Sequence, residues 1–289
     1  MNGISYATTT AIATSVALSL VSAPAMAFTI TQNNSTQDLL DALLGDTTGL
    51  SNFSISTTGD ANAFGLFNDD PFDLGSGIVL STGNAIVLAG QNAEDGGIIA
   101  DFSTVPNDLS TDFGTEGAED DAISLSISFD ADTSVDKLFF EYVFGSEEFV
   151  EFGGSTFNDS FELLLNGENL ATLTDGQSVT INHLVPDPEG SYHPDFISNP
   201  TGSTTMTKLD GYTKPLTFEG LVNQNATNTL TINIKDVGDG YLDSAVFLKG
   251  GSLGTQLPPN AERVPEPGVL FGLAMVTGMT LLKKFKPQL

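Results

Sequence analysis

Ile123-Ser124-Leu125-Ser126-Ile127-Ser128-Phe129 is the stretch of sequence that decides the fold. Apolar and hydroxyl residues alternate in it without interruption. Period-two alternation is typical of a β-strand with one face in the core and the other in solvent. Leu230-Thr231-Ile232-Asn233-Ile234 repeats the pattern a hundred residues later. We therefore expect sheets that bury one face each.

Further strand-like segments surround these two. Lys137–Phe144 is a fuller apolar run, which predicts a central strand. Phe161–Leu165 is followed by Asn166-Gly167, a type I′ turn signal that leads into Asn169–Ala171. Several short strands separated by Gly, Asn and Asp predict an all-β fold, a two-sheet β-sandwich of jelly-roll-like architecture. The shorter strand candidates are Phe53–Ile55, Ile78–Leu80 and Ala245–Leu248.

Two other segments of the central region stand out. Thr36–Leu44 predicts one short N-terminal helix, which Ser35 or Thr36 caps and Gly45 ends. Pro186–Pro215 predicts a long irregular insertion, a kind of loop that is usually functional or disordered. Twenty Phe and no Trp predict a core in which Phe is the main large residue.

The N-terminus predicts export. Residues 1–27 contain no acidic or basic side chain and end in Ala25-Met26-Ala27, a pattern that signal peptidase accepts. A buried N-terminal helix is the alternative, but the segment has no polar face at any helical period. We expect cleavage after Ala27.

The C-terminus predicts a hydrophobic helix behind a linker. Residues 254–264 form the linker, and Gly268–Leu282 is an apolar run that ends in Lys283 and Lys284. At about 1.5 Å per residue this run is short for a hydrocarbon core of about 30 Å. A short anchor and a sorting signal that is later processed both fit. A core helix fits less well, because the run is apolar all round and has a basic end.

Val264-Pro265-Glu266-Pro267, the hydrophobic run and the Lys-rich end together resemble the PEP-CTERM sorting signal of Gram-negative bacteria. The resemblance assigns 265–289 to sorting, with Pro265, Glu266 and Pro267 as the motif. It implies recognition by a membrane-embedded exosortase, at least transient attachment to the bacterial membrane through the C-terminal helix, and delivery to the outer surface or extracellular matrix.

The acidic composition limits which kinds of partner the protein can bind. Residues 28–267 hold all thirty-seven acidic residues and six of the nine basic ones. Such a body is repelled by nucleic acid and by anionic lipid, and it attracts divalent cations, basic partners or water. The chain has no cysteine, so disulfides and zinc-thiolate sites are excluded.

Acidic loops suggest calcium as the one candidate cofactor. Calcium binds six to eight hard oxygens, and loops that mix Asp with Gly can bring such oxygens together. We expect calcium binding if the acidic loops meet at one end of the sandwich. The alternative is that these residues lie in solvated turns and bind no ion. The candidate ligands are Glu147, Glu148, Asp159, Asp236, Asp239 and Asp243.

No catalytic residue is predicted. Glu141 with Glu147 or Glu148 could serve as the acid and base of a glycosidase, but nothing in the sequence singles out one carboxyl for a raised pKa. His183 and His193 lack a zinc-binding context, and no nucleophile elbow is present.

Three blocks in the body resemble the choice-of-anchor L domain, in the order that the family has them. They imply a surface domain over residues 28–253, found with different anchors, and they imply no reaction. The blocks are Leu74–Asn84, then Glu141–Phe149 with Phe157–Phe161, and finally Asp236–Phe247.

The expected function is therefore that of an exported, non-enzymatic structural or adhesive protein of the cell envelope or matrix, stabilised by Ca²⁺. A surface module that binds or cleaves glycans, with matrix polysaccharide as its partner, is the alternative. A plain membrane-anchored protein is a third possibility.

Overall fold

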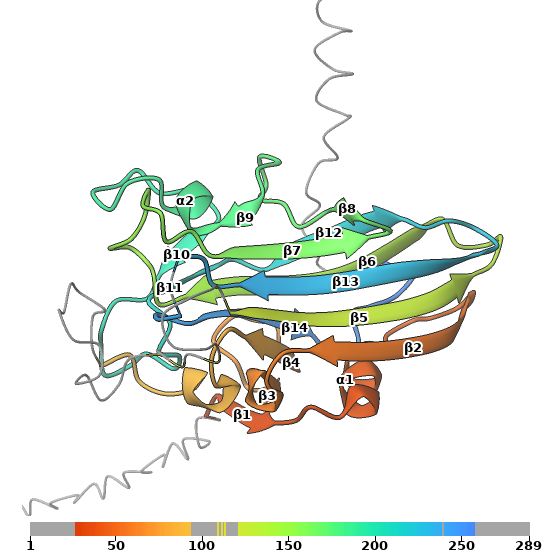
Figure 1. Ribbon diagram of the computed structural model, residues 1–289, viewed down its shortest axis with the longest axis horizontal. Helices are drawn as coiled ribbons and strands as arrows, with labels where there is room; N and C mark the ends of the chain where they lie inside the picture. The colour runs from red at the N-terminus through yellow and green to blue at the C-terminus, as the bar shows by residue number, and fades with distance from the viewer. Residues whose placement is uncertain are drawn as a thin grey trace, which may run out of the picture.

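Two antiparallel β-sheets packed face to face make up the computed structural model of the chain (Figure 1). The structure describes residues 27–93, 109, 111, 113, 121–238 and 240–257. The predicted all-β sandwich is confirmed. The segments predicted as signal peptide and C-terminal hydrophobic helix lie outside the described residues, except for Ala27, which is exposed.

The first sheet has eight strands. In spatial order it contains β1 (Thr29–Gln32), β3 (Phe64–Asn68), β4 (Ser76–Ser81), β14 (Ser244–Lys249), β6 (Lys137–Ser146), β11 (Gly211–Thr213) and β10 (Phe196–Ser198), and β12 (Leu216–Leu221) also pairs with β6. The central position predicted for β6 is confirmed.

The second sheet has six strands and contains both of the alternating stretches. Its order is β2 (Leu50–Thr58), β5 (Ala122–Ala131), β13 (Ala226–Lys235), β7 (Ser160–Leu165) and β8 (Glu168–Asn169), with β9 (Val179–Thr180) also paired to β7. Strands β5 and β13 lie side by side with Ile127 opposite Leu230, so their apolar residues face the core together. Asn166 and Gly167 join β7 to β8 with φ of 54° and 88°, and a type I′ turn needs positive φ at both positions.

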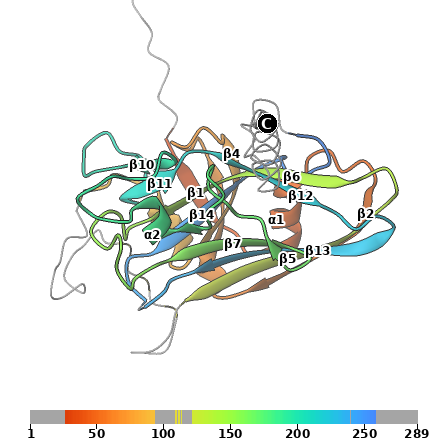
Figure 2. The same cartoon turned by 90° about the horizontal axis from the view of Figure 1, so that it is seen from above.

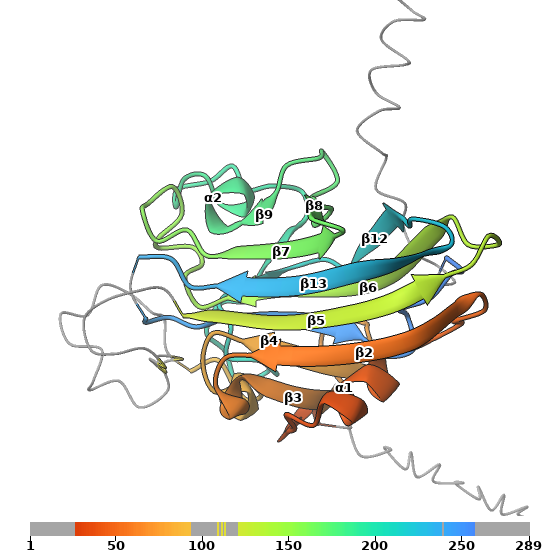
Figure 3. The ribbon, with the colours of Figure 1, turned by 45° about the vertical axis from the view of Figure 1, so that its right-hand side comes forward.

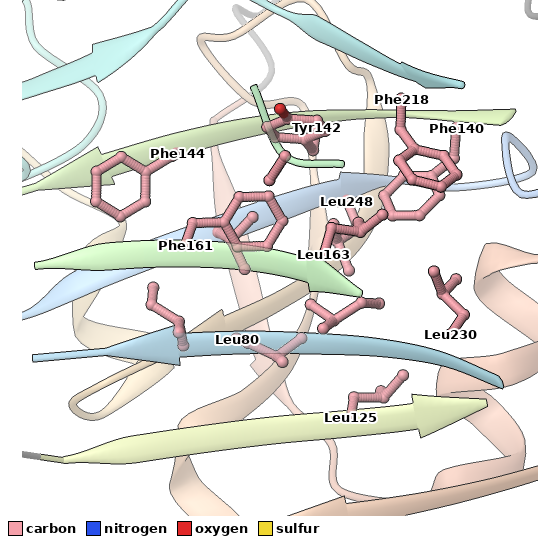
Figure 4. Close-up of a cluster of buried hydrophobic side chains, with 14 of the residues drawn as sticks. Leu80, Leu125, Phe140, Tyr142, Phe144, Phe161, Leu163, Phe218, Leu230 and Leu248 are labelled. Atoms are coloured by element: carbon pink, nitrogen blue, oxygen red, sulfur yellow. The ribbon is translucent and has the colours of Figure 1, made fainter. Parts of the chain in front are cut away.

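The main core lies between the sheets (Figure 4). The rings of Phe140, Tyr142 and Phe144 from β6 point toward Leu125 and Leu230 of the opposite sheet. A second cluster, which includes Phe67, Phe72 and Phe247, covers part of the outer face of the first sheet. Strand β6 is therefore buried on both faces, which explains its continuous apolar sequence. Phe supplies most of the large buried rings, as predicted.

The predicted N-terminal helix is α1 (Thr36–Leu43). Ser35 caps it by accepting a hydrogen bond from the Asp38 backbone N–H, and its apolar face packs against β2 and β4, one strand from each sheet (Figure 2). Three shorter turns of helix are present in the described part of the chain and were not predicted: η1 (Ala61–Ala63), η2 (Ala85–Leu88) and α2 (Ile181–Leu184).

The predicted irregular insertion, Pro186–Pro215, is only partly irregular. It contains β10 and β11, which extend the first sheet beyond β6. Each has three residues, too few for an alternation to be visible in the sequence. Their backbone hydrogen bonds, rather than their side chains, place them in the sheet.

The chain leaves the sandwich near the start of β6. Leu253 bridges Leu44, Gly254 bridges Phe139, and the Thr255 N–H donates to the Asp46 carbonyl at 2.8 Å. The last described residues, 253–257, therefore lie at this end of the domain. Within the described residues, no helix has the length and apolar character needed to cross a membrane.

Candidate functional site

The acidic loops converge at the end of the sandwich where β6 finishes. In the first sheet Ser146 at the end of β6 lies opposite Ser244 at the start of β14. In the second sheet Lys235 at the end of β13 lies opposite both Ser160 of β7 and Ala122 of β5. Antiparallel pairing thus brings the residues that flank these strand ends together. We call them the acidic end: Asp121, Glu147, Glu148, Asp159, Asp236 and Asp243.

All six carboxylates of the acidic end are buried. Asp159 is 0% exposed, Asp236 and Asp243 are 1% exposed, and even Asp121 is only 6% exposed. Carboxylates are almost never buried to this extent without a partner, because removing a charge from water is costly. The alternative interpretation from the sequence, solvated turns, is therefore wrong for these six residues.

Asp159 connects the two sheets. Its Oδ1 accepts a hydrogen bond from the Val237 N–H at 2.9 Å, in the loop after β13. Its Oδ2 accepts one from the Ser244 hydroxyl at 2.6 Å, at the start of β14 in the other sheet. Hydrogen bonds to an ionised acceptor in a buried setting are the strong ones, so this carboxylate ties the sandwich together at its end.

Asp243 is the carboxylate with the least favourable surroundings. Its Oδ1 accepts a hydrogen bond from the Thr111 N–H at 3.0 Å, while its buried Oδ2 has no hydrogen-bond partner among the residues that the structure describes. Gly83 lies directly beside Oδ2, and a Cβ at Gly83 would come within 1.7 Å of it. The glycine is therefore required by close approach.

The electrostatics of Asp243 follow from that position. The pKa of Asp243 is raised to about 8, mainly by burial; the hydrogen bonds from Thr111 oppose this rise, and the neighbouring charges of Asp121 and Asp159 contribute to it. A carboxyl group in such a place binds either a proton or a cation.

Glu147 and Glu148 lie on the first-sheet side of the acidic end. The Glu147 N–H donates to the Asp243 carbonyl at 3.2 Å, and the Glu148 N–H donates to the Ser146 hydroxyl at 2.9 Å. Asp210 belongs to the same neighbourhood, because its N–H donates to the Ser146 carbonyl at 3.1 Å. Asp210 is not among the predicted ligands, because it lies within the insertion predicted as irregular and has no acidic neighbour in the sequence.

The structure brings five of the six predicted calcium ligands to one end and leaves the sixth undetermined. Asp239 lies outside the described residues, as do Ala25 and the Pro265-Glu266-Pro267 motif. Among the residues that the structure describes, no group of three or more Asp, Glu or His side chains is arranged to hold a metal ion. Calcium binding at the acidic end stays a prediction.

The carboxylate pair considered for glycoside cleavage is too far apart. Glu141 and Glu147 are six residues apart along an extended strand, roughly 20 Å. Glycosidase acid and base groups lie within about 10 Å of each other. Glu141 is also held in an ion pair with Lys249, with 2.6 Å between Nζ and Oε2.

Asp195 is a buried carboxylate outside the acidic end, and its charge is balanced by hydrogen bonds and a lysine. It accepts hydrogen bonds from the Thr174 N–H at 2.7 Å and the Thr174 hydroxyl at 2.9 Å, and its Oδ1 lies 3.0 Å from the Lys214 Nζ. Burial alone would raise its pKa, but the hydrogen bonds from Thr174 and Lys214 outweigh it and lower the pKa of Asp195 below its ordinary value.

The fold and the site together define a two-sheet β-sandwich domain with a buried carboxylate cluster at one end. The chain belongs to the Choice-of-anchor L domain family, whose sequence profile matches residues 29–254. The resemblance seen in the three sequence blocks is thereby confirmed. Membership places the protein among cell-surface or exported proteins.

Other comparisons add little. No curated protein sequence matches the chain. Among solved structures, the chain is similar to a family 35 carbohydrate binding module from an environmental isolate, with 13% identity over 62% of this chain and 98% of that one. The TM-score is 0.21, so this similarity carries no argument about function.

Proposed function

We propose that the protein is a non-catalytic structural or adhesive domain, displayed at the outer surface or in the extracellular matrix of a Gram-negative-type bacterium. The observation that carries this proposal is the position of the chain's exit. Gly254, close to the last described residue, bridges Phe139 near the start of β6, whereas the acidic end lies beyond Ser146, where β6 finishes. Seven residues of extended strand separate the two, roughly 23 Å.

The placement of the tail and the acidic loops at opposite ends of the domain suits a domain tethered by its C-terminus. A tail that leaves from one end keeps that end toward the membrane, at least until an exosortase-type enzyme has processed it. The acidic loops then face away from an anionic membrane surface, which lowers the electrostatic repulsion between the two. The acidic composition keeps the displayed domain soluble.

Replacing Pro265, Glu266 and Pro267 by Ala tests the display. In the native bacterium the replacement is expected to remove most of the protein from the fraction that externally added protease can digest. Replacing Pro258 and Pro259 in the preceding linker is the matched control and is expected to leave the surface level unchanged. Equal surface levels for both variants would refute the sorting role. The intact mass of the surface form tells whether the tail is retained or removed.

We also propose that the acidic end binds Ca²⁺. The support comes from Asp243, whose Oδ2 is buried without a hydrogen-bond partner among the described residues and whose pKa is raised by the nearby charges of Asp121 and Asp159. Calcium accepts carboxylate and carbonyl oxygens in flexible geometry. Binding requires a side-chain rearrangement that brings at least three of the carboxylates onto one ion, and it would join loops from both sheets.

Isothermal titration of the EGTA-treated protein with CaCl₂ tests the ion. We expect one saturable binding event per chain that Asp243→Asn weakens at least about tenfold, since one ionic ligand is worth more than 1.4 kcal/mol. Asp136→Asn, an exposed carboxylate near the other end, is the control and should bind as the wild type does. A wild-type protein that gives no heat of binding would rule out the site.

A further inference from the structure

The outer face of the second sheet carries a regular array of small polar side chains. Strands β2, β5 and β13 lie side by side in it, and each contributes three outward positions in alternation. We call this set the hydroxyl face: Ser54, Ser56, Thr58, Ser124, Ser126, Ser128, Thr229, Thr231 and Asn233.

The strand register arranges these side chains in three rows. Ser128 of β5 lies opposite Ser54 on one side and Thr229 on the other. Ser126 likewise lies between Ser56 and Thr231, and Ser124 lies between Thr58 and Asn233. Neighbouring strands are about 4.8 Å apart, and positions two residues apart along a strand are about 6.8 Å apart. The array is therefore a grid with a fixed repeat in both directions.

The buried residues on the other face of the sheet fix the outward orientation of the grid. The alternate residues of β5, Ile123, Leu125, Ile127 and Phe129, are at most 2% exposed in the core. A one-residue slip of register would bring them to the surface, so the hydroxyl side must face outward. Figure 3 shows β7, β13, β5 and β2 as a broad sheet, and no element of the described chain packs across its outer side.

The hydroxyl face is uncharged in a strongly acidic protein. None of its nine residues is ionisable, whereas the chain has a formal net charge of −28. Charged side chains occur only at its borders. Asp130 lies beyond one end and Lys235 beyond the other. Glu162 of β7 lies beside the last row, opposite Asn233; it forms an ion pair of 3.5 Å with Lys235 and accepts a hydrogen bond from the Asn233 side-chain amide at 3.4 Å.

This chemistry selects the kind of partner. Hydroxyl and amide groups donate and accept hydrogen bonds at once, and the hydroxyls of a neutral sugar do the same. A stable protein interface needs an apolar core, and these nine residues present none. An anionic polymer would gain no ion pair here and would be repelled by the rest of the protein.

We propose that the hydroxyl face is a docking surface for a neutral polysaccharide. The proposal extends the display role by giving the displayed domain a partner class. It involves a different part of the molecule from the acidic end, because the grid lies along the strands and not in the loops at their ends.

Affinity electrophoresis in native gels tests the docking surface. The purified protein is run in gels that contain dextran, hydroxyethyl cellulose or laminarin as neutral probes, and alginate as the acidic one, all in EGTA. The variants Thr229→Glu and Ser126→Glu place a carboxylate within the grid. Thr31→Glu, at an exposed position on β1 in the other sheet, adds the same charge elsewhere and is the control. Melting curves confirm that each variant is folded.

The wild type and Thr31→Glu are expected to be retarded by at least one neutral probe and not by alginate. The longer Glu side chain stands above the grid and keeps a flat-lying polysaccharide away from the neighbouring hydroxyls, so either grid variant should bind at least about tenfold more weakly, a loss of about 1.4 kcal/mol. Migration unaffected by every neutral probe, or equal retardation of grid variants and control, would overturn the proposal. These outcomes do not depend on cell-surface delivery, so they are separate from failure of the display test.

Discussion

Asp159 and Asp130 each accept two hydrogen bonds that join neighbouring segments, but they lie at opposite ends of the sandwich. Asp159 is fully buried and joins the two sheets. Asp130 lies near the surface and accepts from the Asn52 amide at 2.7 Å and from the Thr227 hydroxyl at 2.5 Å, within one sheet. The hydrogen bond from Asn52, and then that from Thr227, lowers the pKa of Asp130.

The position of a carboxylate in this protein decides whether hydrogen bonding or burial controls its pKa. At the exposed end, hydrogen bonds favour the ionised form, as they also do for Asp132 through Ser134. At the acidic end, burial dominates, and the pKa of Asp243 is raised. The same residue type is therefore held in its ionised form by hydrogen bonds at one end, whereas at the other end burial favours a bound proton or cation.

Replacing the two matched residues should give the largest difference. Asp159→Ala leaves two buried donors, the Val237 N–H and the Ser244 hydroxyl, without their acceptor, and we expect a loss of about 2–4 kcal/mol in the free energy of unfolding. Asp130→Ala leaves donors that water can reach, and we expect about 0.5 kcal/mol. Urea denaturation measures the free energy of unfolding of both variants. Equal losses would show that burial does not make Asp159 more important for stability than Asp130.

A substitution at Gly83 should show how tightly Asp243 is packed. Gly83→Ala places a Cβ against the Asp243 carboxylate, and we expect a loss of about 1–3 kcal/mol from overpacking. Gly202→Ala is the control, because its Cβ would meet nothing closer than 3.7 Å. Combining Gly83→Ala with Asp243→Ala should recover part of the loss. Strict additivity in this double-mutant cycle would show that the two residues do not interact.

Acid titration should show what Asp195, a buried carboxylate with a basic partner, contributes to stability. The folded-state pKa of Asp195 is lowered, so its contribution to stability is present above its ordinary pKa of 3.8 and is lost as the pH falls through the folded value. Asp195→Asn should lower stability at pH 7 and flatten the decline of stability below pH 4. Asp136→Asn serves as the control. If the Asp195→Asn profile runs parallel to that of the wild type down to pH 2, the pairing with Lys214 and Thr174 contributes nothing.

The strands and the helix could be predicted where a local sequence pattern alone determines the structure. The alternation at Ile123–Phe129 and Leu230–Ile234 gives two strands, and the structure pairs them directly. The helix at α1 follows from its cap and its apolar spacing. The short strands β10 and β11 were not predictable, because backbone pairing with β6 and not side-chain pattern defines them.

The acidic end was predicted only in part for a similar reason. Acidic residues near strand ends suggested loops that meet, and Glu147, Asp159 and Asp243 do lie at one end. Their burial could not be read from the sequence, since it depends on segments such as Gly83 and Thr111 that come from distant parts of the chain. Asp210 joins them through strand pairing alone.

Calorimetric melting with and without Ca²⁺ is the most direct test of the proposed Ca²⁺ binding at the acidic end. Calcium at about a hundred times its Kd adds about 2.7 kcal/mol, and for a domain of this size that raises Tm by roughly 5–10 °C. The rise should be reversed by EGTA, be lost in Asp243→Asn, and persist in Asp130→Asn. A wild-type transition at the same temperature in Ca²⁺ and in EGTA would contradict Ca²⁺ binding at the acidic end.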